Sequence, residues 1–287
     1  MTGLRFLLWL LCATLAPQYL LASPKALFYL TNKPDSIRSF LAHANQVDIL
    51  VPAWYSVDAN GLVWGGPDPL VMQTAKQAHV PVMPIVANAG FDQQEFHKLA
   101  TNPAAYQNMI AALIRECEQN GYTGFQFDFE HIFWTDRDAL TNLVQKAAAA
   151  FHQHGLKLSI ATVPNAPGHP GATTSDKWAY ANWRGAYDLK AIAASVDLIS
   201  LMTYDQHTQG SPPGPVSGYA WTARNLDYAL KIVPKEKLSL GIPLYGKRWY
   251  SGVPSAKGQP SETAASISGR DVQLLIKTYH PQVQWDP

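Results

Sequence analysis

Residues 124–130 read GFQFDFE, and this short stretch decides which fold the rest of the sequence favours. Three phenylalanines alternate strictly with the polar residues Gln126, Asp128 and Glu130. In an extended strand, alternate side chains point to opposite faces, so the phenylalanines share one face and the polar residues share the other. A parallel strand covered by helices is normally apolar on both faces. Because a buried row of polar groups is costly, the pattern predicts a functional site.

Apolar, strand-like runs alternate with helical segments on both sides of this stretch. Seven runs are candidate parallel strands: Lys25–Leu30, Val47–Trp54, Val80–Ala87, Gly124–Glu130, Leu156–Val163, Val196–Tyr204 and Leu238–Tyr245. One intervening helix is expected to begin at Pro103 after Asn102 and to end before Gly121. This alternation predicts a parallel sheet, either open and doubly wound or closed into a (β/α)8 barrel. Glycine-rich phosphate loops do not follow the first strands, which favours the barrel.

The C-terminal part of the sequence offers too few strands for a closed barrel. After Trp249 one more helix is predicted, over Gly269–Tyr279, and no clear eighth strand follows. We therefore expect an α/β fold, a (β/α)8 TIM-type barrel that lacks its eighth strand in this chain, formed by residues 23–287 as a single catalytic domain. Two explanations stay open: C-terminal truncation, or a native barrel that is open and has an incomplete site.

The N-terminus has the pattern of an export signal. Arg5 precedes the apolar run Phe6–Leu15, and the small residues Ala22 and Ser23 follow. The run is shorter than the roughly 20 residues that span a bilayer, which disfavours an uncleaved anchor; a buried first helix is the other alternative. We expect residues 1–22 to be a secretory signal peptide, and the protein to be secreted or periplasmic, without membrane association after cleavage.

The charge balance excludes one large class of partners. The sequence has 22 Lys and Arg against 21 Asp and Glu, and the two signs are interspersed. No sustained positive field is available for a phosphate backbone, so we expect no nucleic-acid partner. The histidines His152, His154 and His169 fall at helix ends and in loops without a matching ligand set, so no metal or cofactor is implied. We expect a monomer.

Asp128 and Glu130 form the candidate catalytic pair. They are two residues apart, which is roughly 6.6 Å along a strand at about 3.3 Å per residue. Like charges held this close raise one pKa, which would keep Glu130 protonated and able to donate to a leaving oxygen. The alternative is a solvated strand end with acids paired to Lys or Arg. The flanking phenylalanines favour the functional interpretation.

The FDFE segment resembles the core of the DxxDxDxE signature of glycoside hydrolase family 18, the chitinase-like family. The resemblance implies that Glu130 is the proton donor and that Asp128 holds the acetamido group of the substrate. Gln126 stands where the middle Asp of the signature is usual, and Thr123 where the first is usual. Neutral residues there are typical of the spore-germination-protein-like branch of the family. Gln126 would then tune Asp128 through a neutral hydrogen bond.

The resemblance continues downstream. LMTYDQH at 201–207 is similar to the sixth-strand MxYD element, which implies that Tyr204 and Asp205 reach the acetamido group and that Met202 lines the base of the site. LSLGIPLYGKRW at 238–249 is similar to the seventh strand and its loop.

Further binding residues are expected near the predicted strand ends. Trp54 and Trp249 are candidate platforms for sugar rings, with packing as the structural alternative. Tyr245 and Asn165 are further candidates for substrate binding.

The resemblance implies a glycosidase that cleaves β-linked N-acetylglucosamine-containing glycans: chitin, chitooligosaccharide or peptidoglycan. The mechanism would be substrate-assisted and retaining, which is the exception to the scheme with two protein carboxylates. A catalytically weak chitinase-like carbohydrate-binding protein is the alternative. The intact Glu130 argues against it, because lectin-like relatives typically lose this acid. A binding protein without chemistry would not explain the row of polar residues.

Overall fold

A computed structural model of the chain describes residues 25–209, 211–249 and 264–284. The predicted signal peptide, residues 1–22, lies outside this described part. None of the described helices is long and apolar enough to cross a membrane.

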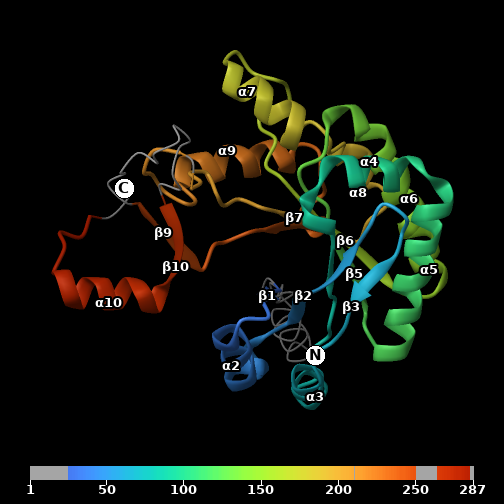
Figure 1. Cartoon of the computed structure of the whole chain (residues 1–287), viewed down its shortest axis with the longest axis horizontal. Coiled ribbons are helices and arrows are strands. Elements are labelled where there is room, and N and C mark those ends of the chain that lie inside the picture. Colours follow the sequence, from blue (N-terminus) through green and yellow to red (C-terminus); the bar gives the residue numbers. More distant parts are fainter. Residues whose placement is uncertain (1–24, 210, 250–263, 285–287) are drawn as a thin grey trace, which may run out of the picture.

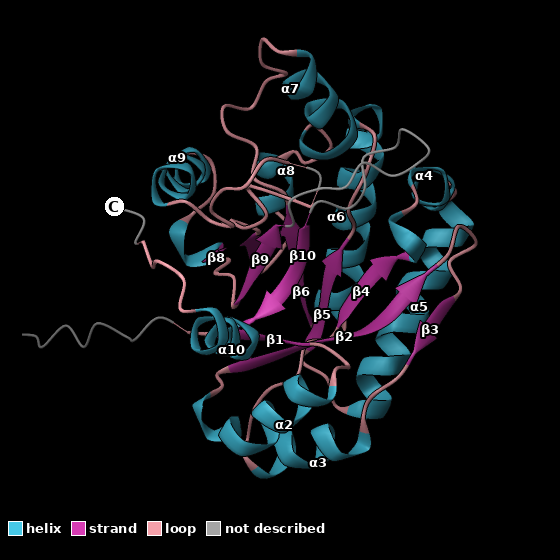
Figure 2. Ribbon diagram, turned by 60° about the vertical axis from the view of Figure 1, so that its left-hand side comes forward, coloured by secondary structure: helices cyan, strands magenta, loops and turns pink. Residues whose placement is uncertain are grey.

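The sheet contains the seven parallel strands that the sequence predicts, in the order in which they occur along the chain. They are β1 (Leu27–Leu30), β2 (Ile49–Val57), β4 (Ile85–Asn88), β5 (Gly124–Asp128), β6 (Lys157–Thr162), β7 (Leu198–Leu201) and β8 (Leu238–Leu240). A short strand, β3 (Val63–Gly65), pairs antiparallel with β2. Among the described residues β1 and β8 do not pair with each other, so the curled sheet is a barrel without its closing strand (Figure 2).

The last predicted strand is shorter than expected. β8 ends at Leu240, and Tyr245 begins a separate strand, β9 (Tyr245–Trp249), which forms an antiparallel pair with β10 (Ala264–Ser268). Pro243 lies between the two strands and has no backbone N–H for a sheet ladder, which accounts for the interruption.

Helices cover the outer face of the sheet, where α4, α5, α6 and α8 lie along one side of the strands (Figure 1). The helices are α2 (Pro34–His43), α3 (Pro69–Gln77), α4 (Gln93–Thr101), α5 (Pro103–Asn120), α6 (Arg137–Gln153), α7 (Thr174–Ala179), α8 (Leu189–Ala193), α9 (Tyr219–Leu230) and α10 (Gly269–Tyr279). Shorter turns are η1 (Ala44–Gln46), η2 (Ala89–Phe91), η3 (Trp134–Asp136), η4 (Tyr180–Arg184) and η5 (Lys235–Lys237).

The ends of α5 show why local sequence predicted this helix well. The Asn102 side chain accepts hydrogen bonds from the backbone N–H groups of Ala104 and Ala105, and Pro103 occupies the first helical position. Gly121 closes the other end with φ +72°, in the left-handed region that glycine adopts without strain.

The core lies between the sheet and the outer helices and fixes which face of β5 points inward. Phe125, Phe127 and Phe129 are completely buried, and the rings of Phe125 and Phe151 on α6 have centroids 6.5 Å apart. A slip of one residue would move all three rings to the other face, so the burial specifies the register. The polar face of β5 consequently points into the barrel, as the alternation predicts.

Candidate active site

The polar face of β5 begins with Gln126, which is fully buried in a network of neutral groups. Its Nε2 donates to the Tyr29 hydroxyl at 2.6 Å, and its Oε1 accepts from the hydroxyls of Ser159 at 3.1 Å and Ser200 at 3.3 Å. These partners come from β1, β6 and β7. The structure shows no hydrogen bond from Gln126 to Asp128, so the expected tuning of Asp128 by this amide is wrong. The nitrogen and the oxygen of the amide instead form hydrogen bonds with hydroxyl groups of β1, β6 and β7 in the barrel interior.

Asp128 is the next residue along this face, and its environment is poor in partners. Burial raises the pKa of Asp128 to about 6. Its Oδ1 atom is buried and has no hydrogen-bond partner in the described part of the chain. Buried polar atoms without a partner are uncommon in native structures, and this oxygen is available to accept a hydrogen bond from a bound group.

Asn88 holds the backbone of Glu130. Strand β5 ends at Asp128, but the Asn88 side chain continues the pairing: its Nδ2 donates to the Glu130 carbonyl at 3.1 Å, and its Oδ1 accepts from the Glu130 N–H at 3.0 Å. Asn88 is buried at the end of β4, and the hydroxyl of buried Tyr187 donates to the preceding carbonyl, that of Phe129, at 2.7 Å. Sequence reasoning missed Asn88; a polar residue at the carboxyl end of an apolar strand was the available signal.

Glu130 is kept in the protonated form at neutral pH. Its pKa is raised to about 8, first by burial, then by the negative charges of Asp128 and Asp205. The sequence prediction named repulsion by Asp128 as the cause; the structure shows that loss of solvation is the larger contribution. A carboxylic acid with this pKa is a suitable proton donor near pH 7.

The loop after β7 brings Tyr204 and Asp205 to the same end of the barrel. The pKa of Tyr204 is raised by burial first and then by Tyr29, Asp128 and Glu130, so its hydroxyl remains a neutral donor beside the two acids. Asp205 forms an ion pair with Lys247 at 2.8 Å and a hydrogen bond with the Tyr245 side chain. The centroids of the Tyr204 and Tyr245 rings are 6.3 Å apart. Strand β9 therefore secures the loop that carries Tyr204.

The remaining predicted residues are placed as follows. Met202 is buried, directly after β7. Asn165 is buried in the loop after β6, and its Oδ1 has no hydrogen-bond partner in the described part. Trp249 lies on β9, and its indole N–H donates to the Ser211 carbonyl at 3.1 Å.

The position of Trp54 contradicts the prediction that this residue is a platform for a sugar ring. Only 7% of its surface is exposed, and its ring centroid lies 6.3 Å from that of Tyr122 in the core between sheet and helices. The pairing of β2 with β4 shifts register between Ala53 and Tyr55, which lets Trp54 and Tyr55 both enter this core. Trp54 is therefore a packing residue and not a platform for a sugar.

Left-handed backbone conformations of residues other than glycine occur in the loops at the same end of the barrel. Phe91, His131 and Asp205 have φ of +50°, +56° and +56°, and they follow β4, β5 and β7 respectively. Left-handed conformations are unfavourable for residues other than glycine and persist where surrounding structure enforces them, commonly at functional sites.

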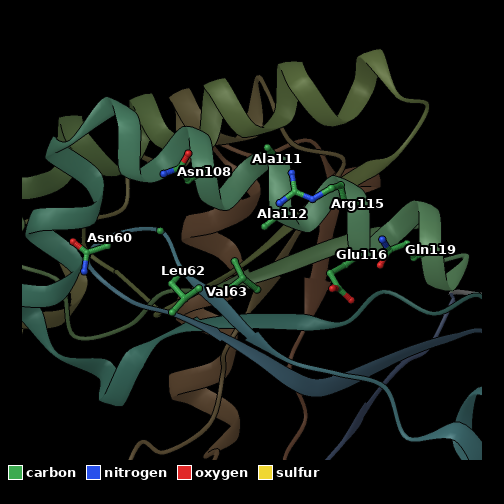
Figure 3. A pocket seen from close by; sticks show the side chains of 10 residues that line it. Asn60, Leu62, Val63, Asn108, Ala111, Ala112, Arg115, Glu116 and Gln119 are labelled. Carbon is green, nitrogen blue, oxygen red and sulfur yellow. The ribbon is translucent and has the colours of Figure 1, made fainter.

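A surface cavity lies away from these residues. It has a volume of about 490 Å³ and is lined by residues of α5 and of the turn and strand around β3, among them Asn60, Leu62, Arg115 and Glu116 (Figure 3). None of the predicted site residues lines it. The described residues also contain no group of three or more His, Cys, Asp or Glu side chains that could hold a metal ion.

Comparison with known proteins agrees with the geometry. The sequence model of glycosyl hydrolases family 18 matches residues 25–287. The Bacillus subtilis protein YdhD, named as a sporulation-specific glycosylase, is 28% identical over 266 residues, which are 90% of this chain and 59% of YdhD. The cortical fragment-lytic enzyme of Bacillus subtilis is 25% identical over 235 residues, which are 81% of this chain and 52% of that enzyme.

Solved structures show the same fold. The chitinase of Chromobacterium violaceum superimposes with a TM-score of 0.79 at 25% identity, covering 91% of this chain and 78% of that one. The spore cortex-lytic enzyme SleL of Bacillus megaterium superimposes with a TM-score of 0.77 at 23% identity, covering 91% and 59%. The chain thus spans between half and two thirds of the length of the curated relatives named above. It belongs to glycosyl hydrolase family 18, in the spore-germination-like branch.

Proposed function

We propose that this chain hydrolyses β-linked N-acetylglucosamine-containing glycans with retention of configuration, using the acetamido group of the substrate as the nucleophile. The observation that carries the proposal is the pairing of an acid held protonated, Glu130, with a buried carboxylate, Asp128, that has an unpartnered oxygen. The catalytic residues of the proposal are Glu130, Asp128 and Tyr204.

In the first step, Asp128 accepts a hydrogen bond from the acetamido N–H, and Tyr204 donates to the acetamido oxygen. That oxygen attacks the anomeric carbon while Glu130 transfers its proton to the glycosidic oxygen, so the leaving sugar departs as an alcohol. The bound ring becomes an oxazolinium ion whose positive charge lies beside Asp128. This scheme replaces the protein nucleophile by a substrate group held in place.

In the second step, ionised Glu130 takes a proton from water, and the water oxygen attacks the anomeric carbon from the face that the leaving group vacated. The bond to the acetamido oxygen breaks, the product keeps its original configuration, and Glu130 is protonated again. One carboxyl group therefore acts as acid and then as base.

The buried Gln126 network stabilises the barrel interior next to Asp128. The contact of Asp205 with Tyr245 stabilises the loop that carries Tyr204. We infer that Asp205 and Tyr245 contact the cleaved sugar, with Met202, Asn165 and Trp249 as further contacts. Chitin, chitooligosaccharides and peptidoglycan all contain the required acetamido group. The names of relatives include chitinases and cortex-lytic enzymes, so each of these polymers is a substrate to test.

Such polymers occur outside the cytoplasm, and the pattern of residues 1–22 supports export of this chain to the cell exterior or the periplasm. That the chain acts there as a monomer is part of the proposal. Detection of the mature N-terminus near Ser23 in a secreted fraction would test the export.

The decisive experiment compares the wild type with Glu130→Gln on a fluorogenic N-acetylchitobioside. We expect kcat/KM to fall by roughly 10²–10⁴-fold in the variant, because general acid catalysis contributes about this much. Exposed Glu236 supplies a matched control, Glu236→Gln, with unchanged rates. The wild-type profile should be bell-shaped, with limbs near pH 6 and pH 8, from ionisation of Asp128 and of Glu130. Equal rates for wild type and Glu130→Gln would overturn the assignment.

A sugar-binding protein without turnover is the second candidate, because the described strands leave one side of the barrel unclosed. It predicts equal affinity of wild type and Glu130→Gln for chitotetraose by calorimetry, with no product formed by either.

A further inference from the structure

The surface cavity between α5 and the turn that joins β2 to β3, here named the flank cavity, has walls that the fold holds in place. The backbone N–H groups of Asn60 and Leu62 donate to Asp58 Oδ1 at 2.9 Å, which fixes the turn. Gly61 in this turn has φ +78°, and a Cβ atom there would lie 1.9 Å from the Ala105 carbonyl oxygen. Glycine therefore lets the turn pack directly against the start of α5. The flank cavity lies on the outside of the barrel, whereas the acids of β5 face inward (Figure 3).

Glu116 presents to this cavity a carboxylate group that is already oriented. Its Oε2 atom accepts hydrogen bonds from the hydroxyl of Tyr55 at 2.8 Å and from Nδ2 of Asn120 at 3.0 Å. Tyr55 is buried, and burial raises the pKa of Tyr55, so its hydroxyl keeps the proton that it donates. The hydroxyl of Tyr122 lies 3.0 Å from that of Tyr55 and completes the arrangement. Within the described ranges Oε1 of Glu116 has no hydrogen bond and no ion pair, so it is available to accept from a ligand.

Arg115 contributes the opposite charge to the same cavity. It is exposed, and its guanidinium forms no ion pair or hydrogen bond with any described residue, its neighbour Glu116 included. Ala111 and Ala112 lie one helical turn earlier on the same side of α5. Because alanine side chains end at Cβ, they leave space between the charged groups and the turn. The flank cavity thus holds a cation and an anion that do not neutralise each other.

The composition of the lining indicates the class of ligand. No aromatic side chain lines the described wall, so the flat surface that usually covers the apolar face of a sugar ring is missing. Glu116 would repel a phosphate or another anion, and Arg115 would repel a simple cation. A ligand that carries both an ammonium and a carboxylate group satisfies both residues. The volume of about 490 Å³ lies within the range of sites for small molecules.

We propose that the flank cavity binds a short peptide that carries a free ammonium and a free carboxylate group. The ammonium donates to Oε1 of Glu116, and the planar guanidinium of Arg115 donates two hydrogen bonds to the carboxylate. Among the three polymers considered above, only peptidoglycan carries such peptides on its glycan strands. This link rests on the proposed function, because the flank cavity would hold a wall peptide while the barrel interior cleaves a glycan. It favours peptidoglycan as the natural polymer.

Calorimetric titration with three peptides tests the binding. The first is Nα-acetyl-L-lysyl-D-alanyl-D-alanine, which has one ammonium and one carboxylate group; the second is also acetylated on the lysine side chain, and the third ends in an amide. We expect the wild type to bind the first peptide about tenfold more tightly than either of the others, which corresponds to about 1.4 kcal/mol for each charged contact. Arg115→Gln should lose the preference for the carboxylate over the amide. Glu116→Gln should lose the preference for the free ammonium.

Arg224→Gln is the matched control, at an exposed position of α9, and should bind all three peptides as the wild type does. Three results would each overturn the site: equal affinity of the wild type for the three peptides, no binding at millimolar concentration, or preferences that both cavity variants retain.

These titrations do not depend on hydrolysis, so the peptide site and the proposed function can fail separately. Kinetics on peptidoglycan, and on the same glycan after an amidase has removed its peptides, tests the link between them. We expect the wild type to have a lower KM on the intact polymer, and Arg115→Gln to abolish this difference. Equal KM values of the wild type on the two polymers would overturn the link. Peptide binding without hydrolysis of either polymer or of chitotetraose would support the site and refute the proposed function.

Discussion

At the scale of residues, Glu130 and Asp128 differ because their surroundings differ. Both carboxyl groups are buried, but Glu130 experiences the charges of Asp128 and Asp205, and its pKa is about 8 against about 6 for Asp128. At neutral pH one acid can thus hold a proton while the other is ionised, which is the division of roles that the proposed mechanism requires. Gln126 contributes no charge to this balance, and its amide is bound to the neutral groups of the barrel base.

Asn88 allows a direct test of how strictly Glu130 must be positioned. Asn88→Ala removes both hydrogen bonds to the Glu130 backbone, so we expect kcat to fall roughly 10–100-fold with little change in KM, because a displacement of about 1 Å can cost about 10²-fold. The unpaired backbone groups should also lower the free energy of unfolding by about 1–3 kcal/mol. Steady-state kinetics well below the melting temperature separates the two effects.

Asn108→Ala, at an exposed position of α5, is the control for the amide substitution itself. A variant Asn88→Ala that is less stable but retains full kcat would show that Asn88 serves folding alone.

At the scale of elements, β5 carries the acids and the β9–β10 hairpin secures the loop that faces them. Tyr245, Lys247 and Trp249 alternate along β9 and therefore share one face. All three contact the chain that follows β7: Tyr245 and Lys247 reach Asp205, and Trp249 reaches Ser211. Short strand β7 thus receives support for its loop from a hairpin distant in sequence.

Lys247→Met should change the pKa of Glu130 while Glu130 itself stays unchanged. The Lys247 side chain is 7% exposed and pairs with Asp205, whose negative charge raises the pKa of Glu130. Removing the cation leaves this negative charge uncompensated, so the pKa of Glu130 should rise further and the basic limb of kcat/KM should move to higher pH.

Lys247→Arg keeps the charge and should retain the wild-type limb. A shift of the basic limb toward lower pH in Lys247→Met, or the same shift in both variants, would contradict this role for the ion pair.

At the scale of the whole molecule, the raised pKa of Glu130 favours the proposed activity but lowers the stability of the folded state at alkaline pH. The folded pKa of about 8 lies above the ordinary value of 4.5, so the folded state binds this proton more tightly than the unfolded state. Between these two values stability falls as the pH rises, and above pH 8 the folded protein carries a buried charge.

Glu130→Gln should therefore stabilise the protein most at alkaline pH. We expect the difference in melting temperature between variant and wild type to widen from pH 5 to pH 9, by at least about 2–4 °C, since this corresponds to about 1 kcal/mol in a domain of this size. Scanning calorimetry of both proteins, with Glu236→Gln as control, measures it. A difference that stays constant with pH would mean that Glu130 ionises as it does in the unfolded chain.

Much of the architecture could be predicted because it depends on local patterns. Apolar runs, the Asn102 and Pro103 start of α5 and the alternation in β5 each express a preference of a few consecutive residues, and the structure confirms them. The hairpin of β9 and β10 could not be predicted in this way, because its pairing depends on contacts between separate segments. Trp54 was misjudged for a related reason: a register shift beside it turns its side chain into the core.

The sequence alone determined the parallel sheet, the inward row of Gln126, Asp128 and Glu130, and the family to which these motifs point, because side-chain periodicity is a property of the strand itself. Only the tertiary structure decided which groups surround that row. The hydrogen bonds of the Asn88 side chain with the Glu130 backbone and the ion pair of Lys247 with Asp205 join segments far apart in the chain. Their distances follow from how the sheet curls and how the loops pack, and burial, which sets the acidity of Glu130, arises only when the whole core has formed.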